Sequence, residues 1–276
     1  MSLKVSISKK QRTLLFIASA VAILLAIVTT GIFIGEQQIG INLDNKNSVP
    51  SIMNLFGTDW LGRDMFARTI KGLSLSMAVG ILAAFISTII ALTLSVLASW
   101  NIVIDRMVTG LIDLFLSVPH LVLLLLISFA CGGGYQGVII GLALTHWPSL
   151  TRVLRAEMMQ INRTEYVGVS RQLGKSKLWT AKHHMLPHIS SQLVVGFLLL
   201  FPHAILHEAA ITFLGFGLPP EQPAIGIILS ESMRYLSVGM WWLAFFPGLS
   251  LLIMVGLFDL LGKNLQVYLD PFNRQK

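Results

Sequence analysis

Histidine and carboxylate side chains inside apolar runs are the residues of this sequence that could do chemistry. His203 and His207 are four positions apart, so an α-helix places both imidazoles on one face. A neutral imidazole nitrogen is a good ligand for nickel, copper, zinc or cobalt ions. Ionisable groups at membrane depth are also costly, which makes them candidates for a substrate path. We therefore predict that this pair contacts a metal on such a path, with His146 as a weaker third ligand.

Other roles are open for the same side chains. The two histidines could instead hydrogen-bond a neighbouring helix, and two nitrogens do not complete a metal shell, so a second subunit, water or a chelator would supply the rest. We expect Asp113 and Glu208 at an interface or beside the path, and His120, directly after Pro119, mainly at an interface.

The composition indicates that membrane-spanning helices position these residues. The chain has 276 residues, of which 54% are hydrophobic and 12% charged, with a mean hydropathy of +0.75. Soluble domains average roughly 25% charged residues, so the sequence predicts an all-α polytopic membrane protein. The lone Cys131 excludes an intramolecular disulfide. The net charge of +7 lies in loops between apolar runs, which favours a role in membrane orientation over nucleic-acid binding.

Six apolar runs predict six spans of the bilayer, each of roughly 20 residues or more. They cover about residues 13–34, 73–100, 107–131, 135–154, 189–214 and 240–262. With both termini in the cytoplasm, 15 basic residues face inward and five outward, as positive-inside orientation requires. We divide the chain into residues 1–35 (cytoplasmic N-terminus and first span), an external segment 36–71, and a transmembrane domain 72–276 in the cell membrane.

The basic loop within residues 157–188, here called the coupling segment, is too charged for hydrocarbon. It predicts two short helices joined at Gly174, a residue suited to the left-handed turn that ends a helix. The second helix is expected to stop at Pro187. Two short helices between membrane spans indicate a docking device for a partner outside the membrane, although a solvated basic linker is the alternative.

Several separated motifs carry a family resemblance across about residues 55–271. They are Gly57-Thr58-Asp59-Trp60-Leu61-Gly62-Arg63-Asp64, Glu165-Tyr166-Val167 with Leu173-Gly174, His184-Met185-Leu186-Pro187, Phe213-Leu214-Gly215-Phe216-Gly217 and Leu269-Asp270-Pro271. In this order they resemble the C-type permease subunit of peptide and nickel ABC importers.

The resemblance implies a type I ABC importer permease core with a cytoplasmic coupling helix. It also implies a second homologous permease, two cytoplasmic ATPase subunits that hold ATP and magnesium, and an extracytoplasmic substrate-binding protein. The chain has no Walker motif or nucleophile motif, so we expect no catalytic residue and no cofactor of its own. The family's Glu-Ala-Ala triplet falls on Gly168-Val169-Ser170, and its usual isoleucine is His184. The expected coupling residues are Glu165, Tyr166, Gly168, Val169, Ser170, Gly174, Leu186 and Pro187.

The solute is less defined. The stretch Pro202-His203-Ala204-Ile205-Leu206-His207-Glu208-Ala209 looks like the nickel branch of the family, which implies import of nickel, a related transition metal or its chelate. Import of dipeptides or oligopeptides is the alternative. A membrane enzyme or channel that works without ATPases is a third possibility, and it predicts that the coupling segment binds no partner.

Overall fold

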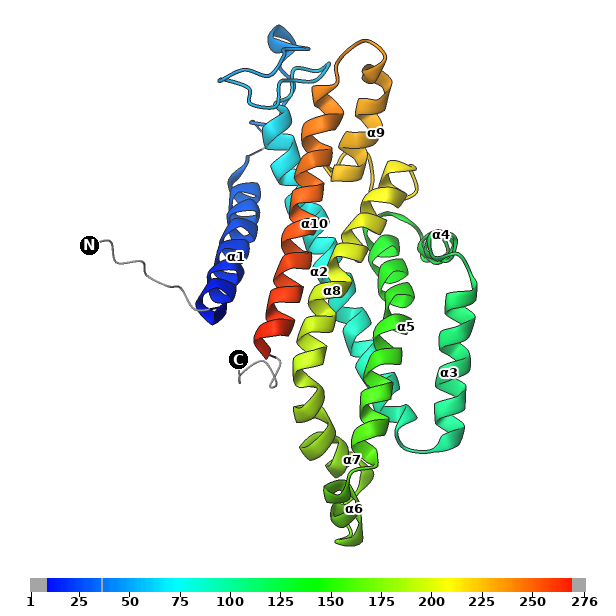
Figure 1. Cartoon of the computed structure of the whole chain (residues 1–276). Helices are drawn as coiled ribbons and strands as arrows, with labels where there is room; N and C mark the ends of the chain where they lie inside the picture. Colours follow the sequence, from blue (N-terminus) through cyan, green and yellow to red (C-terminus); the bar gives the residue numbers. More distant parts are fainter. Residues whose placement is uncertain (1–8, 36, 270–276) are drawn as a thin grey trace, which may run out of the picture.

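The structure is a computed structural model that describes residues 9–35 and 37–269. Within them the regular elements are helical, and Figure 1 shows them as one elongated bundle. The predicted basic residues Lys4, Arg274 and Lys276, and the Asp270-Pro271 ending, lie outside the described residues. The elements are α1 (Lys9–Phe33), the 3-10 turn η1 (Leu43–Asn45), α2 (Met65–Ala98), α3 (Ile102–Ser117), α4 (His120–Ala130), α5 (Gly134–Asn162), α6 (Glu165–Gln172), α7 (Lys177–Thr180), the π-turn η2 (Ala181–Met185), α8 (Leu186–Phe213), α9 (Ile225–Leu236) and α10 (Trp242–Leu269).

Among the described residues, four helical stretches are long and apolar enough to cross a membrane: residues 11–33, 65–98, 177–213 and 242–269. The expected third span, residues 107–131, is not one helix. The chain bends by 99° between α3 and α4, and the bent pair counts as a fifth candidate span. The break falls at Val118 and Pro119, because a residue before proline is driven into extended backbone; Val118 has a ψ of 138°.

The expected fourth span corresponds to α5, which packs closely against α2. Small buried residues of α2 (Ala84, Ala91 and Ala98) let the two backbones approach. The hydroxyl of Ser87 donates to the carbonyl of Ala143 at 2.8 Å. Polar residues are distributed along α5, and it is not among the spans that composition alone identifies in the described chain.

The coupling segment lies at one end of the bundle (Figure 1). Its expected stop at Pro187 is wrong, because residues 177–213 form one helical stretch that includes the π-turn η2. Pro187 lies in the first turn of α8, where a missing N–H and a fixed φ are tolerated.

The opposite end carries an outer cap, made of residues 37–64 and α9 (Figure 1). The buried Asp59 carboxylate pairs with Arg63 at 2.6 Å and with Arg68 at 2.9 Å, and both arginines reach Glu231 of α9. This ion-pair network fastens the segment before α2 to α9.

A proline in α10 also connects α9 to the bundle. Pro247 has no N–H for the carbonyl of Leu243, four residues earlier. The buried Ser232 hydroxyl of α9 lies 2.7 Å from that carbonyl oxygen and 2.6 Å from the Ile228 carbonyl oxygen of its own helix. Since the Leu243 carbonyl lacks its helical donor, it is the acceptor that needs the hydroxyl proton.

Candidate functional site

Three histidines from three helices meet in the bundle. His120 is the first residue of α4, directly after the break at Pro119; His146 lies in α5 and His207 in α8. One ring nitrogen from each lies within 4.8 Å of the others. Ring centroids are separated by 4.6 Å for His120 and His146, by 4.4 Å for His120 and His207, and by 5.2 Å for His146 and His207. We call this group the histidine cluster.

Hydrogen bonds assign the protons on two of the rings. His146 Nδ1 lies 2.9 Å from the carbonyl oxygen of Leu142, which can only accept, so Nδ1 carries the proton of a neutral ring. The lone pair of His146 is then on Nε2, where His207 Nδ1 donates to it across 3.1 Å. His120 Nε2 is buried and has no hydrogen-bond partner within the described part of the chain.

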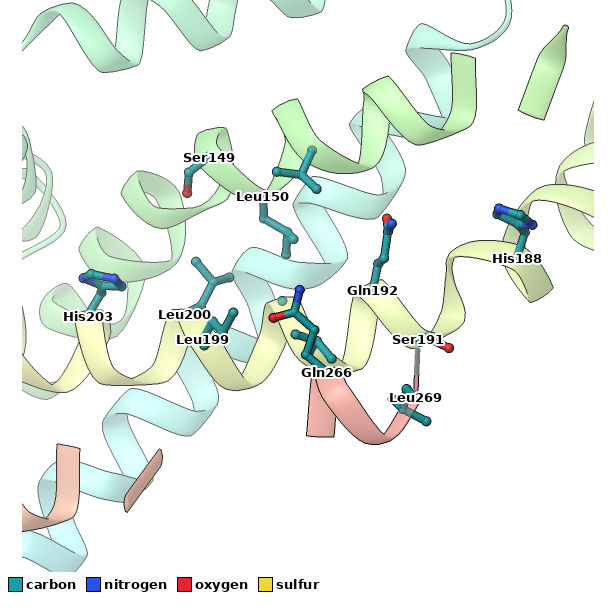
Figure 2. A pocket seen from close by; sticks show the side chains of 13 residues that line it. Ser149, Leu150, His188, Ser191, Gln192, Leu199, Leu200, His203, Gln266 and Leu269 are labelled. Atoms are coloured by element: carbon teal, nitrogen blue, oxygen red, sulfur yellow. The ribbon is translucent and has the colours of Figure 1, made fainter. Parts of the chain in front are cut away.

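His203 is not a member of the cluster, and its expected contact with a metal shared with His207 stays a prediction. It instead lines a cavity of about 720 Å³ between α5, α8 and α10. Figure 2 shows His203 and His188 at opposite ends of the α8 side of this cavity, with Gln192 between them. The cavity therefore extends from the coupling-segment end of α8 to within one helical turn of His207.

The two candidate carboxylates lie apart from the cluster. Asp113 is exposed and accepts from Arg152 of α5 at 3.1 Å. Glu208 is fully buried within this chain, and one of its oxygens accepts from the Thr212 hydroxyl at 2.9 Å. The roles proposed for both at an interface or path stay predictions.

In the coupling segment, α6 ends as expected at Gly174, whose φ is +76°. The N–H of Gly174 donates to Arg171 and that of Lys175 to Ser170, the bond pair that closes a helix around a left-handed residue. Val167 is buried against the bundle. Tyr166, Val169 and Leu173 are exposed at helical spacing, so α6 and its C-cap present a largely uncovered apolar face within the described part of the chain.

Two departures from the family's letters contact each other. The Ser170 hydroxyl lies 2.8 Å from His184 Nε2, and the His184 ring packs edge-on to Tyr166 with centroids 5.2 Å apart. Gly168 lies nearby with open space at its Cβ position. A polar contact therefore joins the two arms of the segment at Ser170 and His184.

Comparison with known proteins identifies the family. Residues 87–275 match the family described as the binding-protein-dependent transport system inner membrane component. The chain belongs to this family. It is a multi-pass ABC importer permease subunit, a class in which ATP hydrolysis takes place in partner ATPases.

Named relatives support the assignment. A putative peptide transport system permease protein of Brucella suis is 34% identical over 222 residues, which cover 80% of this chain and 75% of the relative. The dipeptide transport system permease protein of Bacillus subtilis is 31% identical, covering 83% of this chain and 72% of the relative. The fold is similar to a chain of the MetNI methionine ABC transporter in an inward-facing conformation, with a TM-score of 0.61 and 21% identity over 73% of this chain and 96% of that chain.

Sequence reasoning found part of the histidine cluster. His146 and His207 were candidates for a metal path, whereas His120 was expected mainly at an interface and is a full member. The signal for His120 is Pro119, because a helix that restarts after a proline break can turn its first side chain inward.

Proposed function

We propose that this subunit forms half of the path of an importer for short peptides. The named peptide and dipeptide permeases among its relatives support this solute class. The observation that carries the proposal is the cavity beside α8. Its polar lining residues are serine, glutamine and histidine (Ser149, Ser191, Gln192, Gln266, His188 and His203), and the described lining includes no Lys, Arg, Asp or Glu. Uncharged hydrogen-bonding groups suit a zwitterionic solute that must pass through without being held tightly.

In this proposal the coupling segment faces the cytoplasm and α6 lies in a groove of an ATPase subunit. A helix moves as one unit because its backbone hydrogen bonds are internal, so closure of the ATPases on ATP would displace α6 and the start of α8 together. A second permease completes the path, and the outer cap receives the substrate-binding protein.

Import of a transition metal or its chelate is the second candidate. The histidine cluster specifically favours it, because the rings lie at the upper end of the path that includes His203. In this alternative, one side of the path supplies imidazole ligands and the second permease or a chelator supplies the others.

Paired uptake measurements test the two candidates. Cells that carry the whole importer are given a labelled dipeptide or radioactive nickel at limiting concentration, with an importer-deleted strain as the reference. We expect importer-dependent dipeptide accumulation; importer-dependent nickel accumulation without dipeptide accumulation would replace the peptide proposal with the metal one. In the second case, His203→Ala with His207→Ala is expected to lower nickel accumulation, while co-purification with the ATPases stays unchanged.

A further inference from the structure

We propose that His120, His146 and His207 bind a divalent transition-metal ion within the permease. This inference goes beyond the peptide solute class, because a bound ion is a property of this chain whatever solute is carried. If nickel is the solute, the same site is a station on its path.

Ring nitrogens of His146 and His207 face each other across 3.1 Å. His146 is fixed by its Nδ1–H bond to the Leu142 carbonyl, which leaves Nε2 free to act as a ligand. Backbone carbonyls that hold the second nitrogen in this way are the usual outer partners of metal-binding histidines. His207 Nδ1 faces that same Nε2, so an ion between the two rings would replace the proton they share.

His120 supplies the independent observation. Its Nε2 atom is buried beside the other two rings and makes no hydrogen bond to any described residue. A buried polar atom without a partner costs roughly 1–3 kcal/mol, whereas a metal ion would use its lone pair. Because His120 begins α4 after the proline break, small movements of that helix can adjust its distance to the other rings.

The ligand set selects the class of ion. Three imidazoles without a carboxylate suit nickel, copper, zinc or cobalt, whereas magnesium and calcium require oxygen ligands. In a tetrahedral site with nitrogens about 2.1 Å from the ion, the ligand atoms are about 3.4 Å apart. His146 Nε2 and His207 Nδ1 are already 3.1 Å apart, and the ligand atoms of all three rings lie within 4.8 Å of one another, so small ring movements would suffice to form the site. The fourth position stays open for water or solute.

The position of the site suits exchange of the ion. His203 is one helical turn from His207 on α8 and lines the cavity, so it is the next imidazole that a departing ion would meet. Neutral ligands alone give moderate affinity, as a site within a transport path requires.

Metal binding to the intact importer complex tests the inference. The complex is purified through a tag that contains no histidine, stripped with EDTA, and titrated with Ni²⁺ or Zn²⁺ alone by equilibrium dialysis with elemental analysis. We expect one more ion per copy of this chain in the wild type than in His120→Gln or His207→Gln, each of which should weaken binding at least about tenfold. X-ray absorption of the bound ion should show a first shell of nitrogen from several imidazoles.

A matched control is His183→Ala, which removes a histidine stacked on Trp179 in the coupling segment and should bind metal as the wild type does. Elution in gel filtration verifies that each variant is assembled. Equal stoichiometry and affinity in the wild type and both glutamine variants would overturn the inference. Dipeptide uptake is measured separately from metal binding. The failure of the metal-site inference is therefore distinguishable from the failure of the peptide-importer proposal.

Discussion

At the scale of single residues, backbone carbonyls determine what the polar side chains of this protein can do. The carbonyl of Leu142 fixes the tautomer of His146, and the carbonyl of Ala143, one residue later, accepts from Ser87 of α2. Adjacent residues of α5 thus hold the candidate ligand ring and the neighbouring helix. The main chain therefore orients the His146 ring, and a substitution of the Leu142 side chain would leave this carbonyl in place.

Gly62 is a residue in the outer cap that no other amino acid should replace. Its φ is +73°, and a Cβ there would lie 1.7 Å from the carbonyl oxygen of Asn42. We expect Gly62→Ala to destabilise the cap by roughly 1–3 kcal/mol, since both the strained backbone and the clash must be relieved. Limited trypsin digestion of the complex should show faster cleavage after Lys46.

The matched control is Gly35→Ala, between α1 and the cap. Gly35 has no atom within 4 Å of its Cβ position and no positive φ, so its substitution should leave the cleavage rate unchanged. Equal cleavage rates in the two variants would show that the Asn42 contact does not restrain the cap.

At the scale of elements, long apolar runs predicted most of the candidate spans, because about twenty apolar residues in a helix are long enough to cross the hydrocarbon core. Two predicted helix boundaries were wrong, and both lie at prolines. Pro119 divides the third run, whereas Pro187 lies in a first turn and stops nothing. Residue spacing within α8 placed His203 and His207 on one face, but the cluster also draws His120 from α4 and His146 from α5. Such contacts depend on how the helices pack, which periodicity does not specify.

The turn at Gly174 offers a prediction for coupling. Proline cannot adopt the φ of +76° and would remove the N–H that bonds to Arg171. We expect Gly174→Pro to reorient α7 relative to α6 and to reduce solute uptake at least about tenfold while the complex still hydrolyses ATP. Transport and ATPase rates measured on the same reconstituted complex would check this uncoupling.

Gly174→Asn is the control for that experiment. Asparagine accepts the left-handed backbone conformation and retains the N–H, so transport per ATP should stay near the wild-type value. Normal coupling in the proline variant would argue against the turn as a mechanical link.

At the scale of the whole molecule, the bundle separates two surfaces. The outer cap lies at one end, and the exposed apolar face of α6 lies at the other (Figure 1). If the basic coupling segment is cytoplasmic, the cap must face outward, because both are fixed to the same set of spanning helices.

Cysteine labelling in intact cells tests this orientation. The exposed Cys131 is first replaced by serine. Ile52→Cys in the outer cap, at a position 97% exposed, should react with a membrane-impermeant maleimide added outside. Leu178→Cys in α7, at a position 67% exposed, should react only after the membrane is permeabilised.

The Cys131→Ser background without a new cysteine gives the baseline. Labelling of Leu178→Cys in sealed cells, with Ile52→Cys protected, would invert the topology. That result would also remove the proposed contact between α6 and an ATPase.

The bond between Ser232 and the carbonyl left open by Pro247 limits how the subunit can change shape. Where this contact is shielded from water, tilting α9 away from α10 would leave the Ser232 hydroxyl and the Leu243 carbonyl without this hydrogen bond in an apolar environment. The carbonyl left free by Pro247 thus holds α9 and α10 together. During alternating access, α9 and the upper half of α10 should travel as a single rigid block, and the flexing should occur elsewhere, at the proline break that begins α4.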